Sequence, residues 1–211
     1  MNSLQREQKV LLCGGGGFAG EVIAEFRSRL SGVYDPKLTT ETFEGLPVFR
    51  SLEVAQREGF QEAVIAVGHP RVARRIEAEV AAQSMSLAPA FVSERAILTG
   101  DDNEIGDGSL IMAGTILTNH VRIGKSCVIN INCTVGHGAR LGDFVSIMPL
   151  ASISGLVTLE DDCYLGSQVF VTEGVSVAAR TTLGAQAGVF RNIEEPDLTW
   201  IGSPARHRPS I

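Results

Sequence analysis

Aliphatic residues recur at every sixth position through the second half of the chain. The series runs from Ile105 to Val189, and every member is Ile, Leu or Val. A second series of small or β-branched residues follows each member by four positions, from Ser109 to Ala187. The spacing fits neither the 3.6-residue period of a helix nor the two-residue period of a long strand. A fixed hexad is typical of a parallel β-helix, in which three hexads form one triangular coil.

The register of the repeat predicts which residues stack. Each aliphatic residue should point inward and lie on its equivalent 18 positions away, so the series from Ile105 to Val189 corresponds to about five coils. Such an array is stable only when its coils are stacked and capped. Cys127, Cys133 and Cys163 fall on the small inward series, which predicts buried thiols.

The first part of the chain has a different pattern, in which strands alternate with helices. We expect strands at Val10–Cys13, near Val33–Asp35 and at Ala63–Val67, and helices at Glu21–Leu30, Leu52–Glu58 and Arg71–Gln83. This alternation predicts a small parallel α/β domain of Rossmann type over residues 1–84. Residues 85–211 would form the β-helix domain with its tail, and residues 84–104 would connect the two.

A glycine-rich loop follows the first predicted strand. Gly15, Gly17 and Gly20 match the pattern G-x-G-x-x-G, with a strand before and a helix after. Close backbone approach at a helix N-terminus suits a phosphate group. Asp35 ends the next strand, where a carboxylate can bind a ribose or a base. The domain is about half the usual dinucleotide-binding size, which favours a mononucleotide over NAD; a turn without any ligand is the alternative.

Composition and net charge limit the kinds of partner that we expect this chain to bind. The chain has 211 residues and a net charge of −6, which argues against a nucleic-acid partner because phosphate binding needs a basic surface. No apolar run is long enough for a bilayer, and the polar residues 1–9 do not form a secretory leader. The four cysteines, including Cys13, have no disulfide or metal-ligand spacing. We therefore expect a cytoplasmic protein without a membrane partner.

His137 is the strongest candidate for chemistry in the repeat. Stacking by 18 places Asn119 on one side of it and Gly155 on the other, which predicts an open slot beside the imidazole. Histidine is the usual general base because its unperturbed pKa lies near working pH. His120 stacks on Gly138, one coil away, and is expected close to His137.

These residues carry a family resemblance. Residues 135–144 (VGHGARLGDF) look like the active-site hexads of left-handed β-helix acyltransferases. With the glycine loop (Gly14–Glu21), Asp35 and Val67–His69, the chain resembles the family of sialic acid O-acetyltransferases and nucleotide-aminosugar N-acetyltransferases of bacterial glycan synthesis. Residues 200–206 (WIGSPAR) are similar to the ending that closes the coenzyme A site in such enzymes.

The resemblance implies a left-handed coil and a homotrimer with active sites between neighbouring prisms. His137 would deprotonate the acceptor, and Asn130 matches the family's site asparagine. The residues implied for acetyl-CoA are Gly155, Ser167, Ala185, Arg191, Gly202, Ala205 and Arg206, with no metal required. Those implied for the nucleotide sugar are Gly15, Gly17, Phe18, Gly20, Asp35, Gly68 and His69.

The chain also departs from the family pattern. Phe18 stands where the glycine loop usually has a histidine. Gly138 and Ser146 stand where some aminosugar enzymes have an acid and a second histidine. His120, Asn119 or Asp143 would have to replace the missing partner of the base.

Three functions follow from these observations. The favoured one is acetyl-CoA-dependent N-acetylation of a nucleotide-linked amino sugar. The second is O-acetylation of a sugar of the sialic acid type. The third is a non-catalytic or metal-dependent prism, and a zinc site in such a prism needs several converging histidines. His120 and His137 would be two of them, but His69 and His207 lie in other parts of the chain.

Overall fold

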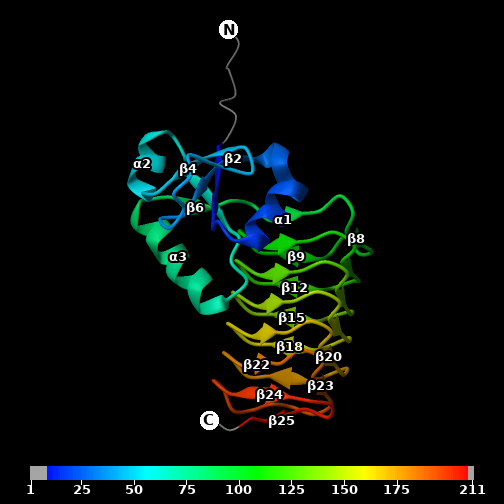
Figure 1. The fold of residues 1–211 in the computed structure, drawn as a ribbon. Coiled ribbons are helices and arrows are strands. Elements are labelled where there is room, and N and C mark those ends of the chain that lie inside the picture. Colours follow the sequence, from blue (N-terminus) through cyan, green and yellow to red (C-terminus); the bar gives the residue numbers. More distant parts are fainter. Residues whose placement is uncertain (1–8, 209–211) are drawn as a thin grey trace. The chain divides into compact units, whose positions relative to one another are not determined.

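The structure, a computed structural model, describes residues 9–208 and divides them into two compact units. The first unit contains residues 9–67 and Arg75–Ala88, and the second contains Gly68–Arg74 and residues 89–208 (Figure 1). Residues 1–8, where we expect no leader sequence, lie outside the described part. Within residues 9–208, no helix is long and apolar enough to span a membrane.

The first unit is built on a sheet of order β3-β4-β2-β1-β5-β6, parallel except for β3. Its strands are β1 (Val10–Cys13), β2 (Leu30–Tyr34), β3 (Thr42–Phe43), β4 (Leu46–Phe49), β5 (Glu62–Ile65) and β6 (Ser86–Leu87). Its helices are α1 (Gly17–Phe26), the 3-10 turn η1 (Arg27–Arg29), α2 (Leu52–Arg57) and the larger part of α3 (Pro70–Ala82). The alternation expected from sequence is thus present.

The first helix is displaced from its predicted position. We expected Glu21–Leu30, but α1 begins at Gly17 and ends at Phe26. Leu30 instead begins β2, where its buried side chain lies beside Val10 of β1. The tertiary sheet therefore overrides the local helical pattern at this boundary.

The second unit is a left-handed β-helix, which confirms the predicted fold. Nearly all of its strands have two residues, and they form three parallel sheets. The first sheet contains β7 (Phe91–Val92), β10 (Leu110–Ile111), β13 (Val128–Ile129), β16 (Ser146–Ile147), β19 (Tyr164–Leu165), β22 (Thr182–Leu183), β24 (Thr199–Ile201) and the antiparallel β25 (Arg206–His207). The second contains β8 (Ile97–Leu98), β11 (Ile116–Leu117), β14 (Thr134–Val135), β17 (Ser152–Ile153), β20 (Phe170–Val171) and β23 (Gly188–Val189). The third contains β9 (Glu104–Ile105), β12 (Arg122–Ile123), β15 (Arg140–Leu141), β18 (Thr158–Leu159) and β21 (Ser176–Val177).

The corners between sheets are named by chain order. The first corner leads from the first sheet to the second, the second corner from the second to the third, and the third corner back to the first. From β9 to β20, each strand pairs with the strand 18 residues further on, as in Val135 with Ile153. From β9 to β23, the second residue of each strand is the predicted aliphatic residue, and from Ile111 to Val189 these side chains form one buried core.

The small inward series has a second role besides packing. Thr115 Oγ1 donates a hydrogen bond of 2.8 Å to the carbonyl of Asn130, and Ser109 Oγ donates one of 2.8 Å to that of Gly124. The Cys133 thiol makes the equivalent bond to Met148, at 3.2 Å. These side chains satisfy corner carbonyls that would otherwise be buried without a donor.

The β-helix begins earlier than predicted. Residues 84–104 are not a simple connection, because they contain β7 and β8. Both strands pair at an offset of 19, as in Ile97 with Ile116. One extra residue before β9 therefore interrupts the six-residue period. Asn103 compensates locally, since its side chain accepts from the N–H of Val121 and donates to the carbonyl of Thr118.

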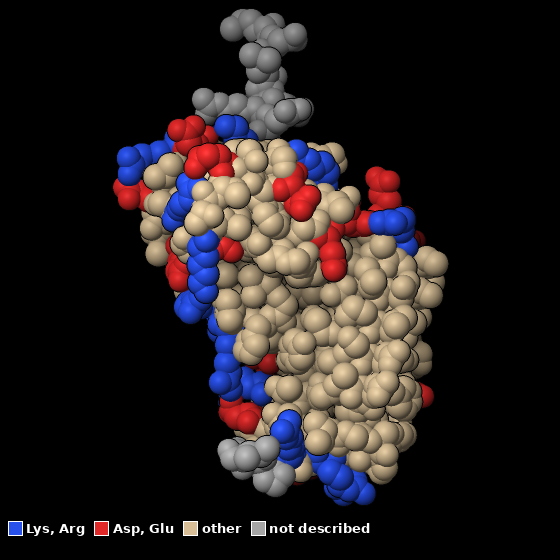
Figure 2. Space-filling view, in the orientation of Figure 1, with Lys and Arg blue, Asp and Glu red and all other residues tan. Residues whose placement is uncertain are grey.

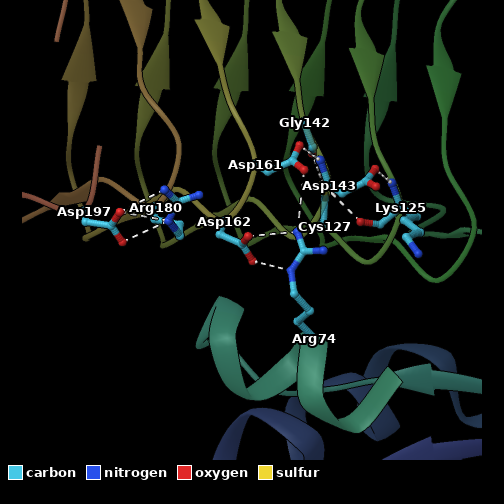
Figure 3. Close-up of polar contacts among 9 residues, drawn as sticks. All are labelled: Arg74, Lys125, Cys127, Gly142, Asp143, Asp161, Asp162, Arg180 and Asp197. Atoms are coloured by element: carbon cyan, nitrogen blue, oxygen red, sulfur yellow. Dashed lines mark hydrogen bonds and ion pairs between the residues drawn. The ribbon is translucent and has the colours of Figure 1, made fainter. Parts of the chain in front are cut away.

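An arginine of α3 is bound tightly at the third corner of the second unit. Arg74 makes two hydrogen bonds to Asp162, of 3.0 and 2.8 Å, and lies 3.6 Å from Asp161 (Figure 3). Its guanidinium also lies 4.2 Å from the ring centroid of the fully buried Phe144. The hydrogen bond to Asp162 raises the pKa of Arg74. A bidentate Arg–carboxylate pair is among the strongest of protein hydrogen-bonded pairs.

We expect Arg74→Ala to lower the free energy of unfolding by about 1–3 kcal/mol, because Asp162 would remain nearly buried without its counter-ion. The measurement is urea denaturation followed by circular dichroism. Arg75→Ala is the matched control, since Arg75 makes only an exposed 3.7 Å pair with Glu79, and its effect should stay within about 0.5 kcal/mol. Equal effects of both substitutions would contradict the role of the Arg74 contact.

The buried thiols predict an alkaline loss of stability. Burial raises the pKa of Cys127 and Cys163 to about 12 and that of Cys133 to about 11, from an ordinary value of 9.0. The folded state therefore holds these protons more tightly than the unfolded state. The contribution of the three thiols to the free energy of unfolding is fully present below pH 9.0 and is lost as pH rises toward 11–12. Denaturation at pH 7–10 should show a smaller alkaline decline in a triple Cys→Ala variant. The same slope in both proteins would refute this assignment.

Candidate functional site

In the glycine loop of the first unit, one glycine is required by its backbone conformation, and two others leave free space at the N-terminus of α1. Gly14 has φ +129°, and a Cβ there would lie 2.8 Å from the carbonyl oxygen of Ala66. Gly16 and Gly17 differ, because a Cβ at either would meet no atom within 4 Å. Gly16 is the N-cap of α1 and gives it no side-chain cap. The first N–H groups of α1 thus begin beside open space, where an anion can bind.

Asp35 lies beside this loop, as the sequence predicted. A Cβ on Gly15 would lie 2.9 Å from Asp35 Oδ2 and 2.6 Å from Leu38 Cδ1. Asp35 Oδ1 accepts a hydrogen bond of 2.8 Å from the N–H of Lys37. This bond holds the carboxylate at the end of β2. Leu38 is a contact that the sequence motif did not reveal.

The other residues of the predicted nucleotide-sugar set have varied surroundings. Phe18 is half-buried in the first turn of α1, and Gly20 lies near Glu44. Gly68 and His69 belong to the second unit by their contacts. The exposed His69 ring is stacked with Tyr164 at a centroid distance of 6.4 Å.

His137 lies exposed at the second corner, and its stacking partner is the predicted one. The position of its imidazole corrects our expectation of an open slot. A Cβ on Gly155 would lie 2.5 Å from Cε1 and 2.9 Å from Cδ2 of His137, so the ring itself occupies the space above the glycine. The structure also explains the glycines on either side of His137. A Cβ on Gly136 would collide with the Gly155 backbone, and Gly138 has φ +66°, which favours glycine.

The imidazole of His137 has no hydrogen-bond or ion-pair partner among residues 9–208. His120 is paired instead with Asp102, through its ring and through a backbone hydrogen bond of 3.1 Å. Its expected contact with His137 is not found in the described structure. Asp143 Oδ1 accepts from the N–H of Lys125 at the third corner and is therefore already used elsewhere.

The remaining residues that the resemblance implies for catalysis and for the acyl donor divide between two corners. Asn130, Ser167 and Ala185 lie at the first corner, whereas His137 and Gly155 lie at the second. The two groups therefore occupy opposite edges of the second sheet in one chain. Asn130 is buried, and its Oδ1 accepts a 2.7 Å hydrogen bond from the N–H of Ile131.

The C-terminal end of the β-helix brings together residues for which the family resemblance implies contact with the coenzyme. Arg191, Ala205 and Arg206 line one pocket of about 130 Å³. Trp200 lines it too, and its indole Nε1 is buried without a partner in the described structure. Gly202 has φ +82°, which favours glycine in this turn. The indole N–H of Trp200 is thus a candidate hydrogen-bond donor that the sequence motif did not reveal.

Within residues 9–208, no group of three or more His, Cys, Asp or Glu side chains is arranged to hold a metal ion.

Comparisons with known proteins connect this architecture to acyl transfer. No protein-family model matches the chain. The sequence is 25% identical over 111 residues to GDP-perosamine N-acetyltransferase of Escherichia coli O157:H7, covering 53% of this chain and 49% of that protein. The chain therefore spans about half the length of this curated relative.

Solved structures agree over nearly the whole chain. A His-to-Asn variant of perosamine N-acetyltransferase from Caulobacter crescentus, in complex with CoA and GDP-perosamine, has a TM-score of 0.89 and 25% identity, covering 96% of this chain and 97% of that one. The acetyltransferase domain of PglB from Neisseria gonorrhoeae FA1090, in complex with acetyl coenzyme A, has a TM-score of 0.83 and 25% identity, covering 95% and 99%. The homologues of this chain are thus hexapeptide-repeat acyltransferases, and its fold is the one that they share.

Proposed function

We propose that this chain is an acetyl-CoA-dependent N-acetyltransferase whose acceptor is the amine of a nucleotide-linked amino sugar. The observation that carries the proposal is the similarity of both units to an N-acetyltransferase bound to CoA and a nucleotide amino sugar. The open glycine loop and the exposed corner histidine are the features of this chain that fit the two substrates.

In this proposal His137 acts as the general base. The neutral imidazole takes a proton from the acceptor amine. The nitrogen of that amine attacks the thioester carbonyl of acetyl-CoA at the same time. The C–S bond then breaks, CoA leaves as the thiolate, and the proton held by His137 can neutralise it. The products are the N-acetyl sugar and CoA. Gly155 contributes by leaving room for the imidazole, because any side chain there would displace the ring.

Acetyl-CoA would lie along the corner residues. Gly155, Ser167 and Ala185 are proposed to contact the pantetheine arm. Arg191 and Arg206, which line one pocket with Ala205, would bind its phosphates, and Gly202 would shape the adjacent turn. The unpartnered Nε1 of Trp200 adds a donor beside these cations.

The nucleotide would bind at the glycine loop. Gly16 and Gly17 leave the start of α1 open, and the carboxylate of Asp35 lies next to Gly15. The proposed contacts are Gly15, Gly17, Phe18, Gly20, Asp35, Gly68 and His69. In this arrangement the helix start receives phosphate oxygens and Asp35 receives a hydroxyl or base donor.

We further propose a homotrimer with the active site between copies. Asn130, Ser167 and Ala185 occupy a different corner from His137, so a second copy has to bring the two groups together. The outward residues of the second sheet carry no charge: Ile97, Ile116, Thr134, Ser152, Phe170 and Gly188. Figure 2 shows few charged side chains over the part of the β-helix that includes β20 and β23. His120 and its partner Asp102 lie one coil from His137 in the same chain.

Replacement of the base tests the mechanism directly. We expect His137→Ala to lower kcat by about 100-fold to 10,000-fold, because general-base catalysis is lost. Thiol release from acetyl-CoA measures turnover, and calorimetry measures CoA binding, which should persist. Asp107→Ala is the control, since Asp107 holds the same hexad place at the third corner. Near-normal turnover by His137→Ala would exclude His137 as the base.

Replacement of Asp35 tests the acceptor site. We expect Asp35→Ala to raise the KM for a nucleotide amino sugar by about tenfold or more, as expected for one lost hydrogen bond to a charged group. The KM for acetyl-CoA should not change. Glu41→Ala, which removes an exposed carboxylate of the same unit, is the control. If neither KM changes, the nucleotide does not bind at the end of β2.

A further inference from the structure

The outer face of the third sheet contains a hollow of about 760 Å³ in the second unit. Four arginines line it: Arg74, Arg122, Arg140 and Arg180. The proposed acetyl transfer does not use this hollow.

Two of these arginines are direct neighbours in the sheet. Glu104, Arg122, Arg140 and Thr158 occupy matching outward positions of four consecutive strands. Neighbouring strands lie about 4.8 Å apart, and like charges directly opposite each other are unfavourable. Glu104 relieves part of this repulsion through a 2.7 Å hydrogen bond to Arg122. Arg140 lies between Arg122 and the hydroxyl of Thr158.

Arg140 is the exception among the four. Arg74 is bound by Asp162, and Arg180 makes three hydrogen bonds of 2.8–3.0 Å to Asp197, as Figure 3 shows. No carboxylate in the described chain makes an ion pair with Arg140, and its guanidinium donates no hydrogen bond to residues 9–208. One cation of the hollow is therefore left without a counter-ion.

The other carboxylates that line the hollow already have partners. Asp161 Oδ1 accepts a 2.9 Å hydrogen bond from the N–H of Asp143. Glu160 Oε2 accepts a 3.0 Å hydrogen bond from the N–H of Ala179. These bonds hold both carboxylates to the backbone of adjacent coils, and among residues 9–208 neither makes an ion pair with Arg140.

We infer that Arg140, together with Arg122 and the Thr158 hydroxyl, binds a phosphate or diphosphate group in this hollow. A guanidinium offers paired N–H donors that match phosphate oxygens, and the threonine adds one O–H donor. An anion between the two arginines also removes their mutual repulsion. The site does not depend on the proposed acetyl transfer, although Arg140 follows His137 by three residues and begins the next strand.

Binding of inorganic pyrophosphate to the full chain, measured by calorimetry, tests this site. We expect Arg140→Gln to raise the dissociation constant by about tenfold to a hundredfold, the range for one hydrogen bond to a charged group. Thr158→Val should raise it by a smaller factor. Arg57→Gln, on α2 of the first unit, is the control that removes an exposed arginine and should change nothing. Equal affinity of wild type and Arg140→Gln, or no binding to wild type, would overturn the proposal.

Competition identifies the source of the anion. Displacement of pyrophosphate by a nucleoside diphosphate, but not by CoA, assigns the site to the acceptor; the reverse assigns it to the acyl donor. Displacement by inorganic phosphate alone assigns it to a free anion. Each result supports the site only if it is lost in Arg140→Gln. A chain that lacks acetyltransferase activity but retains Arg140-dependent binding would refute the proposed function and leave this site intact.

Discussion

The hydrogen bonds between equivalent residues of successive coils are the constraint on which the second unit depends. From β9 to β20, each two-residue strand pairs with the strand 18 positions further on, and bonds such as that from Gly136 N to Ile153 O, at 2.8 Å, continue from one corner to the next. Because the backbone of one coil is satisfied by the next, a residue's place in the hexad decides its direction. The aliphatic columns point inward, and polar chemistry is confined to the corners and the outward positions.

The corners show how closely this stacking restricts side chains. At the third corner, Asp143 and Asp161 each accept the N–H of the residue 18 positions earlier. At the second corner, the equivalent place holds His137, whose ring lies over Gly155. The same hexad place therefore serves the backbone at one corner and leaves a free imidazole at another. A histidine without an internal partner is suited to receive one from a substrate or from another copy of the chain.

The first unit positions its candidate residues by a different principle. Its parallel sheet brings the ends of β1 and β2 to one edge, where the glycine loop meets Asp35. Gly14 and Gly15 are needed because of close contacts with Ala66, Asp35 and Leu38, whereas Gly16 and Gly17 face open space. Packing therefore does not explain why Gly16 and Gly17 are glycines. Their lack of side chains is consistent with approach of a ligand to the start of α1.

The sequence by itself determined the β-helix, its register and the residue that lies over Gly155, because an unbroken period of six specifies which backbone positions stack. It also determined the proximity of Asp35 to the glycine loop, since parallel strands end at the same edge. The early coils were missed because one inserted residue before Ile105 changes the offset to 19. Only the tertiary structure decided where side chains go: that the imidazole fills its own slot, that His120 turns to Asp102, and that Arg74 reaches Asp162. A repeat period specifies the positions of Cα atoms, but rotamers and long-range pairs depend on neighbours that the period does not describe.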